Sequence, residues 1–179
     1  MADTSSPHQE PLLKSQLSLA HTPVVYVAAS AGCDRRLYYL AFSPDDLYTP
    51  IVLIPYDVST KGYSYTGTFV NKYPGLHGIG FIVPKPPPLG EGYVIDFALD
   101  VTVTDGKQLL LSRRANNPIL PFWGGGSGRS GVAVLDYHVP GDLPEDMALT
   151  ITVEVVQSDP RFLELYGSPQ LFVQKFSDE

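Results

Sequence analysis

The sequence contains a single cysteine, Cys33, in 179 residues. One cysteine cannot form an intramolecular disulfide, and this usage is typical of a reducing compartment. No apolar run approaches the roughly 18–20 residues that a membrane-spanning helix needs. The first residues are polar and lack the basic and then apolar pattern of a secretion signal. We therefore expect a cytoplasmic protein without a membrane partner.

Positive charge is also scarce. Lys and Arg total 12 against 19 Asp and Glu, which gives a formal net charge of −7 at pH 7. Nucleic-acid binding requires a basic face that meets the phosphates. The densest basic groups are only the pairs Arg35-Arg36 and Arg113-Arg114. We interpret both pairs as solvated surface and expect no nucleic-acid partner.

The aromatic residues are mostly tyrosine, with 11 Tyr against 8 Phe and 1 Trp. Tyrosine and β-branched residues suit a pleated, half-buried surface, so the composition favours sheet. The length is about that of one domain. Residues 1–22 are polar and contain two prolines. We interpret them as an N-terminal arm and residues 23–179 as the folded domain.

Three stretches alternate between apolar and polar residues. In residues 93–104 the odd-numbered positions are apolar or aromatic, whereas Asp and Thr prevail at the even-numbered ones. Residues 132–139 and 148–156 show the same period of two. A strand places alternate residues on opposite sides, so this pattern predicts a sheet with one buried side. Further candidate strands lie at 24–29, 36–42, 51–58, 63–70, 78–83, 107–113 and 171–176.

The turn and cap residues agree with this pattern. The pair Asp105-Gly106 between two candidate strands is typical of a type I′ hairpin turn. Residues 159–166 are the one helix candidate of note, because Asp159 can cap it and Pro160 suits its first turn. We predict an all-β fold, a single-domain antiparallel β-sandwich or jelly roll of about nine or ten short strands, with one short helix near the C-terminus.

Residues 121–131, PFWGGGSGRSG, concentrate glycine around the only tryptophan. They do not form a phosphate-binding loop, because Trp123 stands where the leading glycine belongs and a strand follows. They also lack the G-x-S-x-G of a nucleophile elbow. Trp123 then has two interpretations, a plug at the end of the core or a stacking platform for a sugar ring. Arg129 in the same loop is a further ligand-binding candidate.

Carboxylates and hydroxyls at alternate positions predict a polar sheet face. Asp96 and Asp100 are about 13 Å apart along one strand, which exceeds the roughly 5–10 Å between the two carboxylates of a glycosidase. Glu154 could form such a pair with either of them, but only if its strand is a neighbour. Aromatic rings beside such groups suit a carbohydrate, although any sheet with one solvated side has the same composition. The ligand-binding candidates are Trp123, Arg129, Tyr65, Asp96, Asp100 and Glu154.

None of the four histidines has metal-ligand spacing to another histidine or to Cys33. We expect no metal and no cofactor. Asp136 and His138 share one side of a predicted strand, about 7 Å apart by strand rise. A carboxylate there can orient a histidine as a general base, but we favour a solvated strand face as the explanation of the pair. His77 is the other weak catalytic candidate.

Three classes of function follow from these patterns. The favoured one is a non-enzymatic binding module, lectin-like, for a glycan or small polar ligand. The second is an oligomeric assembly protein that uses residues 1–22 and the sheet edges. The third is a small β-fold enzyme with Asp136 and His138, or His77, as acid–base groups. The fold alone cannot choose among them, since sandwiches carry all three.

Overall fold

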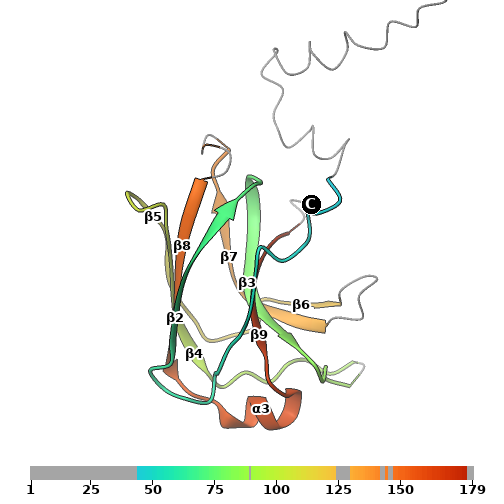
Figure 1. The fold of residues 1–179 in the computed structure, drawn as a ribbon. Helices are drawn as coiled ribbons and strands as arrows, with labels where there is room; N and C mark the ends of the chain where they lie inside the picture. The colour runs from blue at the N-terminus through green and yellow to red at the C-terminus, as the bar shows by residue number, and fades with distance from the viewer. Residues whose placement is uncertain (1–43, 89, 124–129, 142–143, 145–146, 177–179) are drawn as a thin grey trace, which may run out of the picture. The chain divides into compact units, whose positions relative to one another are not determined.

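Two antiparallel sheets pack face to face in the part of the chain that the structure describes (Figure 1). This computed structural model describes residues 44–88, 90–123, 130–141, 144 and 147–176, with only the backbone at positions 120, 122 and 123. Its elements are β1 (Val52–Pro55), β2 (Ser64–Asn71), β3 (Gly75–Val83), β4 (Ala98–Thr104), β5 (Leu109–Ala115), β6 (Leu120–Trp123), β7 (Ser130–Val139), β8 (Met147–Gln157), α3 (Pro160–Tyr166) and β9 (Gln170–Lys175).

The strand order is β1-β9-β3-β7-β6 in a five-stranded sheet and β2-β8-β4-β5 in a four-stranded sheet. All neighbouring strands are antiparallel. The predicted all-β antiparallel sandwich is therefore confirmed. The sequence patterns did not indicate β6, which has four residues and contains Pro121. A short, proline-containing strand at a sheet edge gives little signal.

The core lies between the two sheets, and alternation decides which side chains enter it. In β8 every second residue, from Leu149 to Val155, is fully buried. Val101 and Val103 of β4 are also fully buried beside them. Ile79 and Phe81 of β3, in the other sheet, belong to the same core. Burial of one such side chain contributes about 1.5–3 kcal/mol. The alternating sequence thus selects which side of each strand faces the core.

The predicted strand at residues 93–104 is too long, because β4 begins only at Ala98. The alternation continues upstream, since Tyr93 and Phe97 are buried and Asp96 is exposed. The backbone there bonds to side chains and not to a strand: Val94 N–H donates to the Tyr166 hydroxyl at 2.9 Å. β8 has already ended at Gln157, so no strand accompanies this segment.

The helix α3 forms where the sequence predicts it. The Asp159 carboxylate caps it by accepting the Phe162 N–H at 3.3 Å. Phe162 is fully buried, and its ring lies 5.1 Å from that of Phe97 and 6.1 Å from that of Phe81. The helix therefore closes one end of the sandwich (Figure 1).

The β4–β5 hairpin is also confirmed, although its turn lies one residue later than predicted. Asp105 N–H donates to the Gln108 carbonyl at 3.2 Å, so the two central residues are Gly106 and Lys107. Gly106 has a φ of +85°, which glycine adopts without strain. The Asp105 carboxylate accepts the N–H groups of Lys107 and Gln108 and so fixes the turn.

All described residues belong to one compact unit of the chain. No helix among them combines the length and apolar character needed to cross a membrane. The predicted arm, residues 1–22, and the candidate strands at 24–29 and 36–42 lie outside the described residues. The division into arm and domain stays a prediction.

Candidate functional site

The outward side of the four-stranded sheet is a polar surface built in rows. One row crosses β2, β8, β4 and β5, because each of its residues is the direct partner of the next: Thr66, Thr152, Thr102 and Ser112. The Thr66 and Thr152 hydroxyls are 3.1 Å apart and share a hydrogen bond. We call this surface the polar face, and its residues are Ser64, Thr66, Thr68, Asp100, Thr102, Thr104, Ser112, Arg114, Thr150, Thr152 and Glu154.

A charged row borders these hydroxyls. Glu154 of β8 is the direct cross-strand partner of Asp100 of β4. The two strands are therefore neighbours, which the sequence alone left open. Arg114 binds Asp100 with two hydrogen bonds, from Nε at 2.7 Å and from Nη2 at 2.8 Å. These bonds from Arg114 lower the pKa of Asp100, so Asp100 is a carboxylate at neutral pH.

A polar groove lies beside this row, where β5 and β8 end and β4 begins. Its volume is about 500 Å³. Arg114 belongs both to the groove and to the polar face, and therefore links them. The groove is lined by Ile95, Asp96, Phe97, Ala98, Arg114, Asn116, Asn117, Val156 and Gln157.

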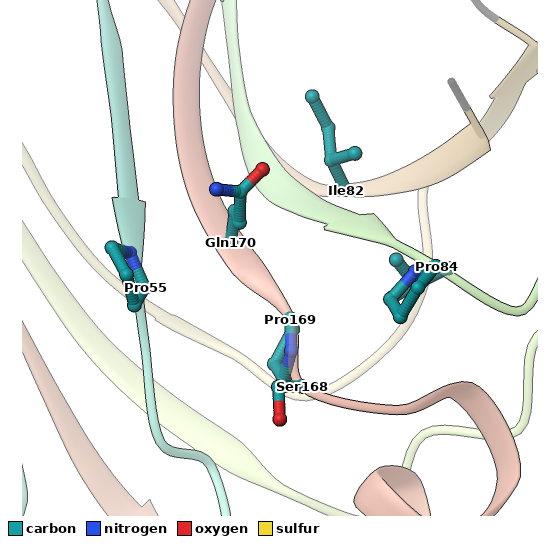
Figure 2. Close-up of a pocket in the computed structure, with 7 residues that line it drawn as sticks. Pro55, Ile82, Pro84, Ser168, Pro169 and Gln170 are labelled. Atoms are coloured by element: carbon teal, nitrogen blue, oxygen red, sulfur yellow. The ribbon is translucent and has the colours of Figure 1, made fainter. Parts of the chain in front are cut away.

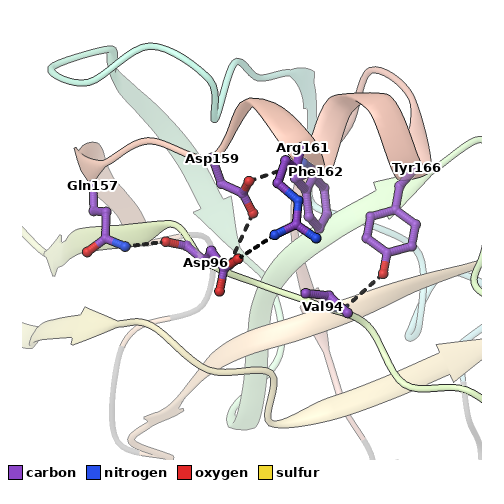
Figure 3. A network of polar contacts seen from close by, with 7 residues as sticks. All are labelled: Val94, Asp96, Gln157, Asp159, Arg161, Phe162 and Tyr166. Atoms are coloured by element: carbon purple, nitrogen blue, oxygen red, sulfur yellow. Dashed lines mark hydrogen bonds and ion pairs between the residues drawn. The ribbon is translucent and has the colours of Figure 1, made fainter.

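The segment that carries Asp96 is held in place by a network around α3 (Figure 3). Asp96 N–H donates to the Asp159 carboxylate at 3.1 Å, and Gln157 Nε2 donates to the Asp96 carbonyl. Arg161 Nη1 lies 3.6 Å from Asp96 Oδ2, and both side chains remain largely exposed. The backbone at Asp96 is thus fixed, whereas its carboxylate is open to solvent.

The groove offers planar polar groups and almost no apolar surface. Asn117 Nδ2 donates to Asn116 Oδ1 at 3.0 Å, which orients both amides relative to each other. Amides supply donors and acceptors together, the Asp96 carboxylate only accepts and Arg114 only donates. Such a set can bind a ligand with several hydroxyls by hydrogen bonds. It contains no histidine.

The predicted ligand-binding residues do not gather at one place. Asp100 and Glu154 pair on the polar face, and Asp96 lies in the groove that Arg114 connects to them. Tyr65 is half-buried and packs against the core, on the opposite side of β2 from the polar face. Trp123 ends β6 in the five-stranded sheet. The Trp123 side chain and all of Arg129 lie outside the described residues.

The catalytic candidates lie in the five-stranded sheet and on both of its sides. Asp136 and His138 pair with Gly78 and Leu76 on the side away from the core. Asp136 Oδ1 also lies 3.9 Å from Arg113 Nη1, within the range of an ion pair. His77 points into the core and is fully buried, with Nδ1 3.0 Å from the Gly75 carbonyl oxygen and its ring 5.4 Å from that of Tyr137. His77 therefore does not share a surface with Asp136 and His138.

A second pocket of about 410 Å³ lies between the ends of β1, β3 and β9 (Figure 2). Three of its lining residues are prolines: Pro55, Pro84 and Pro169. Only Ser168 and Gln170 add polar side chains. Within the described residues there is also no group of three or more His, Cys, Asp or Glu side chains that could hold a metal ion. The polar groove is therefore the richer site for ligand chemistry.

Sequence reasoning missed Arg114, Asn116, Asn117 and Gln157. We interpreted Arg114 as solvated surface because a pair of arginines alone indicates no site. The Asn116-Asn117 pair, which follows the candidate strand at 107–113 after two residues, was the available signal, since it places two amides near a strand end. Gln157 gave no signal, because its role depends on where β8 ends and α3 begins.

No protein-family model and no curated protein sequence matches the chain. Among solved structures, the chain is similar to the crystal structure of GEBA250068378 from Sulfurospirillum deleyianum. The sequence identity is 10% and the TM-score 0.45, and the match covers 72% of this chain and 98% of that chain. A similarity of this size carries no argument about function.

Proposed function

We propose that the protein is a non-enzymatic, lectin-like binding module that holds a glycan or another small polyhydroxylated ligand in the polar groove. The observation that supports this function is the convergence of one carboxylate, one guanidinium and three amides in a groove of about 500 Å³. This volume is typical of small-molecule sites, but most such sites are mainly apolar. The polar lining favours a ligand that is rich in hydroxyls over an apolar one.

The groove is prepared for binding by contacts that exist without a ligand. Two hydrogen bonds to Asp100 hold the Arg114 guanidinium, and its remaining N–H donors are available. The bond between Asn116 and Asn117 orients two amides. Groups that are already ordered lose less conformational entropy on binding. Of the apolar residues that line the groove, only Ile95 and Val156 are partly exposed, so they offer a small contact for the C–H side of a sugar ring.

The groove is open and exposed, so we expect weak binding, with a Kd between about 10 µM and 1 mM. Isothermal titration calorimetry of the full chain against neutral, acidic and amino sugars measures it. Each neutral hydrogen bond contributes about 0.5–1.5 kcal/mol, so N116A/N117A should weaken binding about tenfold. Gln170→Ala, in the second pocket, is the matched control and should bind as the parent chain does.

Two outcomes would contradict this proposal. One is the absence of binding heat with every sugar class. The other is an equal loss of affinity in Gln170→Ala, because that residue lies outside the polar groove.

The other classes of function have different support. The acid–base pair of Asp136 and His138 stays a prediction, and neither residue lines the polar groove. Assembly through a sheet edge rests on a separate observation, given below. We also propose a cytoplasmic location, supported by the single cysteine.

A further inference from the structure

Four strands lie at sheet edges in the described residues, and three of them carry features that oppose pairing with another chain. β1 and β6 have four residues each and contain Pro55 and Pro121. β5 carries Arg113 and Arg114 and has a register shift against β4. Short strands, proline, charge and bulges are the usual protections of a sheet edge.

The fourth edge strand, β2, has none of these protections. Its eight residues, SYTGTFVN, include no charge and no proline, and its register against β8 has no shift. Val155 N–H donates to the Tyr63 carbonyl at 2.9 Å, so the odd-numbered backbone groups of β2 face β8. The even-numbered groups then face the open edge, and Ser64, Thr66, Thr68 and Val70 are all exposed there.

We infer that β2 pairs antiparallel with β2 of a second copy of this chain, about a twofold axis through Gly67. A register that keeps the polar faces on one side must pair even residues with even residues. Pairing about Gly67 meets this condition and places Thr66 opposite Thr68 of the second copy. About eight backbone hydrogen bonds then form, all from groups that face the open edge.

The side chains of β2 are complementary to themselves in this register. On the polar face Thr66 meets Thr68 of the second copy, and on the core side half-buried Tyr65 meets Phe69 of the second copy. Thr–Thr and aromatic pairs are both favourable across antiparallel strands. An unrelated peptide would gain the backbone bonds but not these matched pairs, which is why the sequence favours a second copy. The hydroxyl rows then continue across a sheet of eight strands, four from each copy.

Light scattering after size exclusion, over a range of concentrations of the full chain, tests this inference. The expected mass is twice the 19.5 kDa of one chain. T66K/T68K places like charges directly opposite each other at two positions and should raise the dimer dissociation constant more than about tenfold. Both threonines are exposed, so the substitutions leave the fold intact.

Two further samples make the result specific. Mixing T66K/T68K with T66E/T68E should restore a dimer, because Lys then faces Glu in every pair. Ser112→Lys lies in the same row at the opposite edge of the sheet and should leave the dimer unchanged. A monomeric parent chain at about 100 µM, a mixture that stays monomeric, or an equal loss of dimer in Ser112→Lys would each overturn the inference. None of these results depends on whether the polar groove binds a sugar.

Discussion

The outer sides of the two sheets differ in how much apolar surface they bury. On the four-stranded sheet this side is the polar face, with a row of hydroxyls that crosses all four strands from Thr66 to Ser112. On the five-stranded sheet the outward residues Ile82, Ala133 and Phe172 form a second apolar cluster and are buried. A sheet that is buried on both sides gives nearly continuous apolar strands, whereas one solvated side gives clean alternation. The difference teaches that alternation in the sequence marks a strand with one solvated side.

The largest expected effect on stability comes from replacing Phe172 by alanine. Phe172 is fully buried on the outer side of its sheet, so its removal should cost about 3–5 kcal/mol in the free energy of unfolding. The matched change on the other sheet, Thr152→Ala, removes only the exposed hydrogen bond to Thr66 and should cost about 1 kcal/mol or less. Urea unfolding of both variants measures the difference. Equal costs would show that the two outer sides are not distinct.

A glycine tests the close packing of the five-stranded sheet. A Cβ on Gly80 would lie 2.0 Å from the Val132 carbonyl oxygen, at the irregularity where β3 and β7 shift register. Because backbone cannot move aside easily, Gly80→Ala should cost about 2–3 kcal/mol. Gly92→Ala, which meets no atom within 4 Å, is the control and should be nearly neutral. Thermal unfolding of the two variants measures this difference. An unchanged Tm for Gly80→Ala would show that β3 and β7 are not closely packed at this glycine.

The smallest effect concerns the charged row of the polar face. Arg114 lowers the pKa of Asp100, so this carboxylate stabilises the fold above its unfolded pKa of about 3.9. That contribution is lost as pH falls through the lower folded value. Asp100→Asn should therefore unfold slightly more easily at neutral pH, and the gap should close in acid. Solvent exposure keeps the effect small. A gap that persists unchanged in strong acid would contradict the role of the ion pair.

The sequence predicted much of the fold, for physical reasons. Residues 148–156 alternate because one side packs in the core and the other is solvated, and β8 forms there. The helix was predictable because Asp159 and Pro160 act locally at its first turn. The start of β4 at Ala98 was not, because it depends on where a neighbouring strand ends.

The candidate site was less predictable, because it depends on which strands are neighbours. The Asp100–Glu154 pair requires β4 beside β8, which alternation cannot reveal. The contact between Arg114 and Asp100 requires a register shift in the hairpin. Asp96 was named from the sequence, but its surroundings come from α3 and from the end of β5. A sequence pattern can thus predict which residues are polar and exposed, but not which residues surround them in the fold.

One measurement tests most directly whether the polar groove beside the polar face is the binding site. Backbone and side-chain amide spectra of the full chain, recorded by NMR while the best sugar from calorimetry is added, locate the ligand. We expect shifts at Asn116, Asn117 and Gln157 that saturate together, with Gln170 unchanged. Saturable shifts centred on Gln170 and the second pocket, with the polar groove unmoved, would contradict it.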